Sequence, residues 1–391
     1  MTARGPWIDT FGENFLWSNA TLILKGMAPY GVVALEEIDR CCEKLRVRQH
    51  EPHAWKEEWT AIGEAIERQA RAIDKDGRHV TAGDYLLRAG IYLYNAERFI
   101  LPGPEKRAAG ERAYRVWHEG IRKRHPEIEF VEVPYQGITL PALFKPAQRP
   151  PDAKGAGGGA PTVVIVNGMD NAKEMSVFFA GLEFSRRGFN VLCMDGPGQG
   201  ETMRMRGVVS RYDYEAPGAA AYDYLAARPD VDAKRICIMG YSFGGYYSSR
   251  IAAFEKRYAA CIALSALHWD LAAWQTRIRE KNRDAPGTVA QSNFQFQWVV
   301  GAKDADEAIE IAKKFSLKDV AKNIACPFLV THGGNDRVVP VENAPKLFEA
   351  VGARNKTMKI FTTEEGGAEH AHVDNRPVGI NYAADWLTAN M

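Results

Sequence analysis

The sequence lacks several features that mark particular classes of protein. No apolar run in its 391 residues reaches the roughly 18 residues that a membrane helix needs. The first residues contain no apolar signal-peptide core. The formal net charge is only +1, so no excess of basic residues favours nucleic acid or an anionic membrane. We therefore expect a cytoplasmic protein that binds neither nucleic acid nor a membrane.

The sequence has few cysteines, and their positions predict a role in core packing and not in disulfides or metal binding. Four of the six cysteines fall in or beside apolar, strand-like runs, where cysteine acts as a small hydrophobic residue. The sequence has no C-x-x-C spacing, so neither a disulfide framework nor a cysteine metal site is predicted. The glycine-rich stretch 195–201 lacks the spacing of a P-loop and of a dinucleotide fingerprint, which argues against phosphate binding there.

The length exceeds one typical domain, and the pattern changes character near residue 125. Up to that point, apolar residues recur at three- and four-residue spacing, as in amphipathic helices. We predict a helical amino-terminal cap domain over residues 1–125 and a catalytic domain over residues 126–391.

The second part alternates between strand and helix patterns. It opens with a hairpin over residues 129–144, and short apolar runs then alternate with helical segments. This alternation predicts an α/β fold with a mostly parallel sheet covered on both faces. A largely helical segment, about residues 269–322, interrupts the alternation. We expect it to form a lid over the carboxyl ends of the strands, where ligands bind in open α/β folds.

The sequence Gly240-Tyr-Ser-Phe-Gly244 follows an apolar run and precedes a helix rich in small residues. A G-x-S-x-G pattern in this context predicts a strained turn that exposes the serine hydroxyl above the sheet. The glycines are needed because neighbouring segments approach too closely for side chains. Ser242 is therefore the predicted nucleophile.

A serine nucleophile needs a histidine base and a carboxylate that orients the histidine. Asp336 stands just beyond a predicted strand, in His332-Gly-Gly-Asn-Asp-Arg-Val-Val-Pro340, and is the predicted carboxylate. The stretch 364–374 offers His370 and His372. We favour His370, which directly follows a glycine-containing run, and keep His372 as the alternative base.

Hydrolysis through a tetrahedral intermediate also needs two donors for the oxyanion. The backbone N–H groups of Phe243 and Met169 are predicted for this role. Tyr241, Trp269 and Asp270 are candidates for the substrate pocket. Asp270 could supply an acid to the leaving group, but we favour the simpler interpretation that it is an N-cap of the lid helix.

These motifs resemble the α/β-hydrolase superfamily over roughly residues 129–391. Further stretches widen the resemblance to nearly the whole chain, namely 81–89, 167–174 and 194–201. They are similar to the 2,6-dihydroxypseudooxynicotine hydrolase group, which includes fungal hydrolases that shorten polyketides and relatives of the fermentation-respiration switch esterase. The resemblance implies a serine triad without metal or organic cofactor, a base at His370, and a homodimer. It differs at Ala371-His372, where Cys-Gln is frequent in that group.

We therefore expect a serine hydrolase that cleaves an acyl bond of a small molecule. The resemblance implies that this bond is a carbon–carbon bond next to a ketone, and the aromatic residues of the lid segment favour an aryl ketone or β-diketone as the substrate. The first alternative is a carboxylesterase with the same triad. The alternative from another class is a non-catalytic relative that binds a ligand or a protein.

Overall fold

The computed structural model divides into two compact units. The first comprises Met1–Ile128 and Glu280–Gln295, and the second comprises Glu129–Arg279 and Phe296–Met391. The residues that the structure describes are 5–12, 14–148, 159–169, 171–266, 269–281 and 294–391. Part of the predicted lid, residues 282–293, lies outside them, and the lid stays a prediction. None of the helices within these ranges combines the length and the hydropathy that crossing a bilayer requires.

The first unit is helical, as its sequence periodicity predicts. Its helices are α1 (Phe15–Lys25), η1 (Ala28–Tyr30), α2 (Leu35–Arg46), α3 (Ala54–Lys75), α4 (His79–Glu97) and α5 (Pro104–Arg124). Aromatic rings fill its interior: Trp55 packs against Trp17 and Trp59 with centroids 5.3 and 5.6 Å apart. Helices α4 and α5 approach so closely that a Cβ on Gly90 would lie 2.5 Å from the Cβ of Trp117.

The second unit is built on one eight-stranded sheet with the strand order β1-β2-β4-β3-β5-β6-β7-β8. The strands are β1 (Glu129–Tyr135), β2 (Ile138–Lys145), β3 (Ala160–Val166), β4 (Asn190–Met194), β5 (Val231–Tyr241), β6 (Cys261–Leu264), β7 (Phe328–Gly333) and β8 (Lys356–Phe361). The pairs β1–β2 and β2–β4 are antiparallel, and the other pairs are parallel. The predicted hairpin and the mostly parallel sheet are both confirmed.

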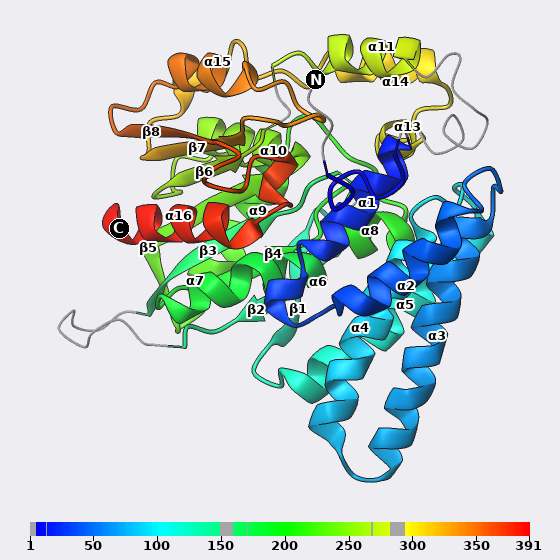
Figure 1. Cartoon of the computed structure of the whole chain (residues 1–391). Helices are drawn as coiled ribbons and strands as arrows, with labels where there is room; N and C mark the ends of the chain where they lie inside the picture. Colours follow the sequence, from blue (N-terminus) through cyan, green and yellow to red (C-terminus); the bar gives the residue numbers. More distant parts are fainter. Residues whose placement is uncertain (1–4, 13, 149–158, 170, 267–268, 282–293) are drawn as a thin grey trace. The chain divides into compact units, whose positions relative to one another are not determined.

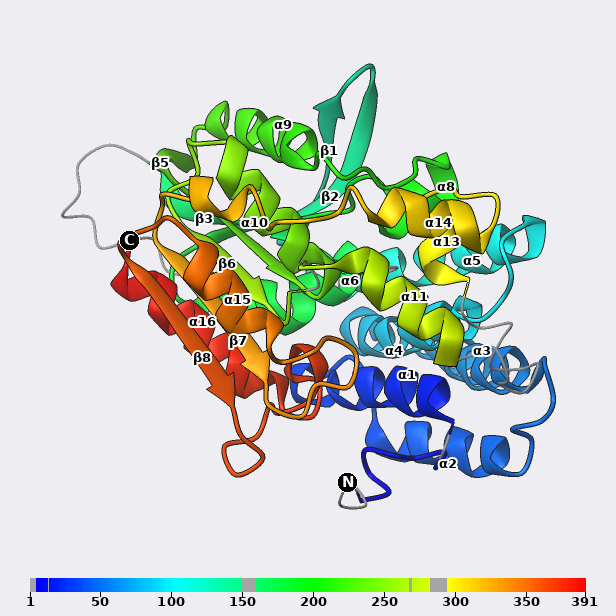
Figure 2. The same ribbon diagram turned by 90° about the horizontal axis from the view of Figure 1, so that it is seen from above.

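Helices connect the strands and cover both faces of this sheet. They are α6 (Lys173–Ser176), the π-helical turn η2 (Val177–Gly181), α7 (Leu182–Arg186), α8 (Gly200–Arg206), α9 (Glu215–Ala226), α10 (Phe243–Phe254), α11 (Leu271–Lys281), α13 (Gln295–Val299), α14 (Ala305–Ala312), η3 (Ala321–Asn323), α15 (Asn343–Ala350), η4 (His370–His372) and α16 (Arg376–Ala389). Helices α9 and α10 lie on one face, and α7 and α16 lie on the other (Figures 1 and 2).

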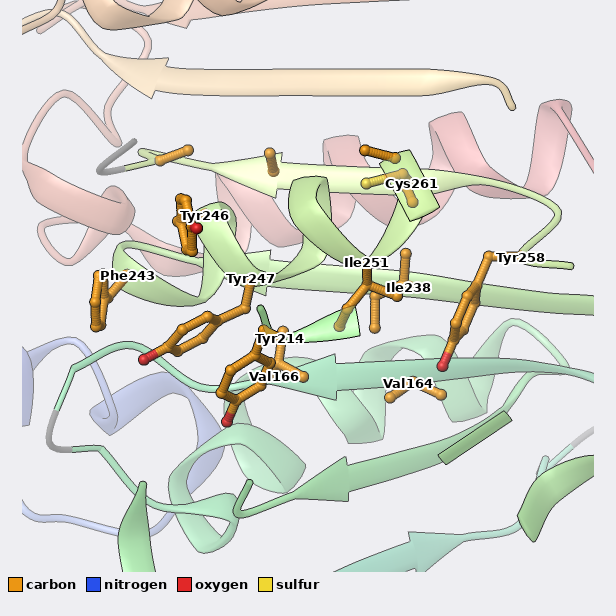
Figure 3. Close-up of a cluster of buried hydrophobic side chains, with 14 of the residues drawn as sticks. Val164, Val166, Tyr214, Ile238, Phe243, Tyr246, Tyr247, Ile251, Tyr258 and Cys261 are labelled. Carbon is orange, nitrogen blue, oxygen red and sulfur yellow. The ribbon is translucent and has the colours of Figure 1, made fainter. Parts of the chain in front are cut away.

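The core between the sheet and helices α9 and α10 is rich in tyrosine. Val164 and Ile238 project from the strands toward rings carried by and near these helices (Figure 3). Tyr214 and Tyr247 stack with their centroids 3.6 Å apart. Phe243, at the start of α10, packs against Tyr247 at 4.7 Å. The first turn of α10, which follows the predicted nucleophile, is therefore anchored by a rigid aromatic layer.

Candidate active site

Ser242 occupies the tight turn between β5 and α10. Its backbone has φ 56° and ψ −122°, a conformation that is costly for any residue with a side chain. A Cβ on Gly240 would lie 1.9 Å from the carbonyl oxygen of Gly244, and one on Gly244 would lie 2.4 Å from that of Asn167. The predicted strain and close approach are confirmed. The turn leaves the serine side chain partly exposed at the carboxyl end of the sheet.

The structure brings Ser242, His370 and Asp336 together. The His370 Nε2 lies 2.8 Å from the Ser242 Oγ, and its Nδ1 lies 2.7 Å from the Asp336 Oδ2. A carboxylate at Nδ1 requires a proton on that nitrogen, so Nε2 is the acceptor that faces the serine hydroxyl. The arrangement is that of a nucleophile, a general base and an orienting carboxylate.

Asp336 is held as a carboxylate by its surroundings. Its Oδ1 accepts hydrogen bonds from the backbone N–H groups of Val338 and Val339, both at 2.8 Å. The Nε2 of His332 donates to the Val339 carbonyl at 3.1 Å and lies 3.3 Å from the Asp336 Oδ2. Burial by itself raises the pKa of Asp336, but His370, His332 and the backbone donors outweigh it, so the pKa is lowered. The side chain of Asp336 is fully buried and ionised at neutral pH.

The loop that carries His370 is organised by Asp374, a residue that the sequence analysis did not single out. Its carboxylate accepts hydrogen bonds from the backbone N–H groups of Gly367, Ala368 and Glu369 at 2.9–3.1 Å. The backbone N–H of Ala371, which directly follows His370, donates to the Ser265 hydroxyl at 3.0 Å. His370 therefore sits between two anchored segments, which restricts where its ring can point.

His372, the alternative base, is engaged elsewhere. Its Nδ1 donates to the Gly367 carbonyl at 2.7 Å, so its Nε2 accepts from the Thr331 hydroxyl at 2.8 Å. Burial lowers the pKa of His372 to about 4, which keeps the ring neutral. The structure places His370, and not His372, against Ser242.

The two amides predicted to bind an oxyanion lie in segments next to Ser242. The N–H of Phe243 belongs to the first turn of α10, where amides have no acceptor within the helix. Met169 lies in the turn that follows β3. On the neighbouring Gly168, a Cβ would lie 3.3 Å from the Ser242 Cβ, so this turn passes beside the nucleophile. The role of the two amides stays a prediction.

A buried ionic cluster supports the turn that carries Met169. Asp195 accepts through Oδ1 from the Asn167 side chain at 2.7 Å and from the Lys173 backbone N–H at 2.8 Å. The Lys173 ammonium lies 3.2 Å from Asp195 and 2.7 Å from each of Glu174 and Glu201. Burial by itself lowers the pKa of Lys173, but the three carboxylates reverse this and raise it. The cluster therefore ties both ends of this turn to the loop after β4.

Tyr241, a candidate for the substrate pocket, belongs to the same network. Asn167 accepts through its side-chain oxygen from the Ser176 hydroxyl at 2.5 Å, and the Ser176 oxygen lies 2.9 Å from the Tyr241 hydroxyl. The Tyr241 ring is buried and packs edge-on against Phe179 at 5.0 Å. Asn167 and Ser176 are thus supporting residues that the sequence analysis missed. The only signal for them is their place in the loop and helix after a buried strand.

The other two pocket candidates precede α11. The Asp270 Oδ1 accepts from the backbone N–H of Ala273 at 2.9 Å, which makes Asp270 the N-cap of that helix. The Asp270 side chain is otherwise exposed, and Trp269 is half-buried. Their roles toward a substrate stay predictions, as does the expectation that no metal or organic cofactor takes part.

Comparison with known proteins gives one family match. The model of the prolyl oligopeptidase family matches residues 178–391, which include Ser242, Asp336 and His370.

Curated relatives match nearly the whole chain. An α/β hydrolase, gkaG, of Penicillium citrinum is 26% identical, over 83% of each chain. The 2,6-dihydropseudooxynicotine hydrolase of Paenarthrobacter nicotinovorans is also 26% identical, over 85% of this chain and 83% of the relative. The 20-hydroxy-prefusarin hydrolase FUS2 of Gibberella moniliformis is 26% identical, over 90% of this chain and 91% of the relative.

A solved structure extends the likeness to the fold. The crystal structure of the 2,6-dihydroxy-pseudo-oxynicotine hydrolase aligns with a TM-score of 0.74 at 23% identity, over 93% of this chain and 94% of that one. At this identity the likeness concerns the fold alone. The predicted α/β-hydrolase fold, with its helical amino-terminal region, is confirmed.

Proposed function

Because the chain belongs to the prolyl oligopeptidase family, a family of α/β-hydrolase enzymes, we propose that it is a serine hydrolase with Ser242, His370 and Asp336 as its triad. The observation that supports this most directly is the imidazole of His370, which lies within hydrogen-bond distance of both other side chains. The geometry meets the requirement that a base within about 3.2 Å must take the proton of the nucleophile.

In the proposed reaction, the Ser242 Oγ attacks the acyl carbon while the His370 Nε2 takes its proton. Asp336 stabilises the imidazolium that forms. The N–H groups of Phe243 and Met169 donate to the oxyanion, and each donor is worth about 3 kcal/mol of barrier. The imidazolium then protonates the leaving group, and the acyl-enzyme forms. Water, deprotonated by His370, releases the carboxylic acid and restores the serine.

The proposed substrate is an aryl ketone or a β-diketone-like small molecule, cleaved at a carbon–carbon bond. Support comes from the relatives named for 2,6-dihydropseudooxynicotine and 20-hydroxy-prefusarin, which match along most of their length. Cleavage of such a bond leaves a carbanion equivalent that must be delocalised and protonated. In a β-diketone the leaving carbon is stabilised as an enolate, so the His370 imidazolium is a sufficient acid, and Asp270 can remain a helix cap.

Labelling with a fluorophosphonate probe tests the triad. The wild-type protein should be labelled at one serine, and Ser242→Ala should not be labelled. Ser316→Ala is the control at a serine outside the proposed triad, and it should be labelled like the wild type. Folding of each variant is checked by circular dichroism. Absence of labelling in folded wild-type protein would support a non-catalytic relative and end the proposal.

The bond type needs a separate measurement. We expect kcat/KM for an aryl β-diketone to exceed that for a matched aryl ester, with release of one carboxylic acid and one ketone. A preference for the ester, with the triad still labelled, would make the protein a carboxylesterase.

A further inference from the structure

A cavity of about 450 Å³ opens in the second unit and is lined by none of the proposed triad residues. Three segments contribute most of its lining: the β1–β2 turn at 135–138, the segment 208–213 that precedes α9, and residues 311–315 at and beyond the end of α14. The volume falls within the range of about 300–1,000 Å³ that is typical of small-molecule pockets.

Three of the large hydrophobic residues that are exposed in this structure line the cavity. Ile138 is 41% exposed, and Val209 and Tyr212 are each 39% exposed, and all three line it. Phe315, which is 1% exposed, contributes a buried apolar wall. Clustered apolar side chains around a concave surface mark a binding site more often than scattered ones do.

Two cationic side chains, Arg211 and Lys314, line the cavity, and only Arg211 is paired with a carboxylate. Arg211 donates to both carboxylate oxygens of Asp213 at 2.7 Å, and also to the Tyr135 hydroxyl at 2.6 Å. Its charge and its donors are therefore committed within the wall. The Lys314 ammonium lies 5.9 Å from the Tyr212 ring centroid. Lys314 is exposed to solvent, and among the described residues no carboxylate lies within ion-pair distance of it, so it is the lining cation that an acidic ligand could reach.

We propose that this cavity is an accessory binding site for a monocarboxylate with an aromatic or alkyl body. The ligand's carboxylate pairs with Lys314, and its apolar body lies against Ile138, Val209 and Phe315. A phosphate monoester carries about two charges near neutral pH and would find only one free cation. A ligand that lacks a negative charge would leave Lys314 unpaired. The binding site does not depend on the proposed hydrolysis.

Two side chains of the cavity lining contact residues of α10, the helix that follows the proposed nucleophile. The Phe315 ring packs against Phe243 with centroids 5.3 Å apart, and Phe243 directly follows Ser242. On a second path, the oxygen of Ser210 in the cavity lies 2.6 Å from the Tyr247 hydroxyl in α10. A ligand here would therefore contact walls that pack on the first turn of α10, without occupying the triad.

Calorimetric titration of 4-phenylbutanoate into the Ser242→Ala protein tests the proposal, because this background excludes turnover. We expect one binding site. Lys314→Gln in that background should weaken binding about tenfold or more, equivalent to ~1.4 kcal/mol. Val209→Trp, which fills the cavity, should abolish it. Lys313→Gln is the matched control, since the neighbouring Lys313 pairs with Glu310 and does not line the cavity. It should leave the affinity unchanged.

Several results would overturn the proposal. These are no binding to folded protein, equal binding of the neutral 4-phenylbutanamide, or unchanged binding in both Lys314→Gln and Val209→Trp. An equal loss in Lys313→Gln would show a general charge effect. Sedimentation addresses the other occupant: a dimer that Ile138→Glu dissociates would mean that a second copy of the chain covers this face.

Discussion

A buried lysine lies in each of the two units, and the two serve different purposes. In the helical unit, the Lys106 ammonium from α5 lies 2.8 Å from the Glu97 carboxylate at the end of α4, and it donates to the Glu97 carbonyl at 3.0 Å. In the second unit, the hydrolase unit, Lys173 lies among three carboxylates: Glu174 beside it in α6, Asp195 in the loop after β4, and Glu201 in α8. Both lysine side chains are at most 2% exposed.

The difference shows what each unit needs its buried charge for. Lys106 joins two consecutive helices through one carboxylate and the carbonyls at a helix end, where a cation is favourable. The cluster around Lys173 instead holds more acids than its ammonium can neutralise, so Asp195 also takes donors from Asn167 and from the backbone. Buried charged groups are therefore concentrated at the carboxyl ends of the strands, where they hold the loops beside Ser242.

A substitution at Asp336 should lower the catalytic activity far more than a matched substitution in the helical unit. Asp336→Asn should lower kcat/KM by about 10⁴, because an amide at this position no longer holds the reactive tautomer of His370. Asp84→Asn is the control in the helical unit, where Asp84 pairs with Arg124 at the surface. Steady-state kinetics should find that control within about twofold of wild type. Comparable losses in both variants would remove the functional contrast between the units.

Replacing each buried lysine should destabilise the protein, and the loss should be larger at Lys173. Lys173→Met should cost about 5 kcal/mol of unfolding free energy and Lys106→Met about 3, at the two ends of the range for breaking a buried ion pair. The first leaves three carboxylates without their cation. Denaturant titration gives both values.

Steady-state kinetics of Lys173→Met and Lys106→Met test whether either lysine also supports catalysis. Only Lys173→Met should also lower kcat, because the turn with Met169 loses its support. Equal kcat values for the two variants would make the Lys173 cluster structural only.

The hydrolase unit should also lose stability in acid through His372. Its pKa is about 4 in the folded protein and 6.5 when unperturbed. As pH falls from 6.5 toward 4, the unfolded chain therefore binds a proton that the folded chain does not. Stability decreases over this window by up to ~3 kcal/mol. His372→Gln should flatten this limb of the stability–pH curve. His79→Gln, at an exposed site of the helical unit, should leave the limb intact, and a flattened limb there would contradict the assignment.

The smallest effect is expected at the surface of the helical unit. Arg71 pairs with Glu119 and Glu67 but is 40% exposed. Arg71→Ala should therefore change the unfolding free energy by no more than about 1 kcal/mol. A loss as large as that of Lys106→Met, measured in the same denaturant titration, would show that the surface pairs also hold this unit together.

The outline of the site could be predicted because its parts have local signatures. The turn at Ser242 requires glycine at 240 and 244, and Asp336 follows an apolar run and precedes a turn. The local sequence favoured His370 through the glycine-containing run before it, but it left His372 as an alternative. They are two residues apart, and positive φ angles at Ala371 and His372 turn their rings to different partners.

The supporting residues were missed for a related reason. Asp195, Lys173 and Asn167 have ordinary local contexts, and the glycine-rich stretch after Asp195 lacks the spacing of a phosphate-binding loop. Their contacts join residues that are 22 and 28 positions apart. Asp374 likewise gains its role only when the chain turns back on residues 367–369.

Local patterns were enough to predict the element types, the hairpin, the strained turn and the candidates Ser242 and Asp336, because period, glycine placement and turn chemistry act over a few neighbouring residues. The folded chain was needed to show which histidine contacts Ser242, which carboxylates surround Lys173, and which lysine lines the cavity. These depend on distances between segments far apart in the chain, which the packing of the sheet and its helices sets.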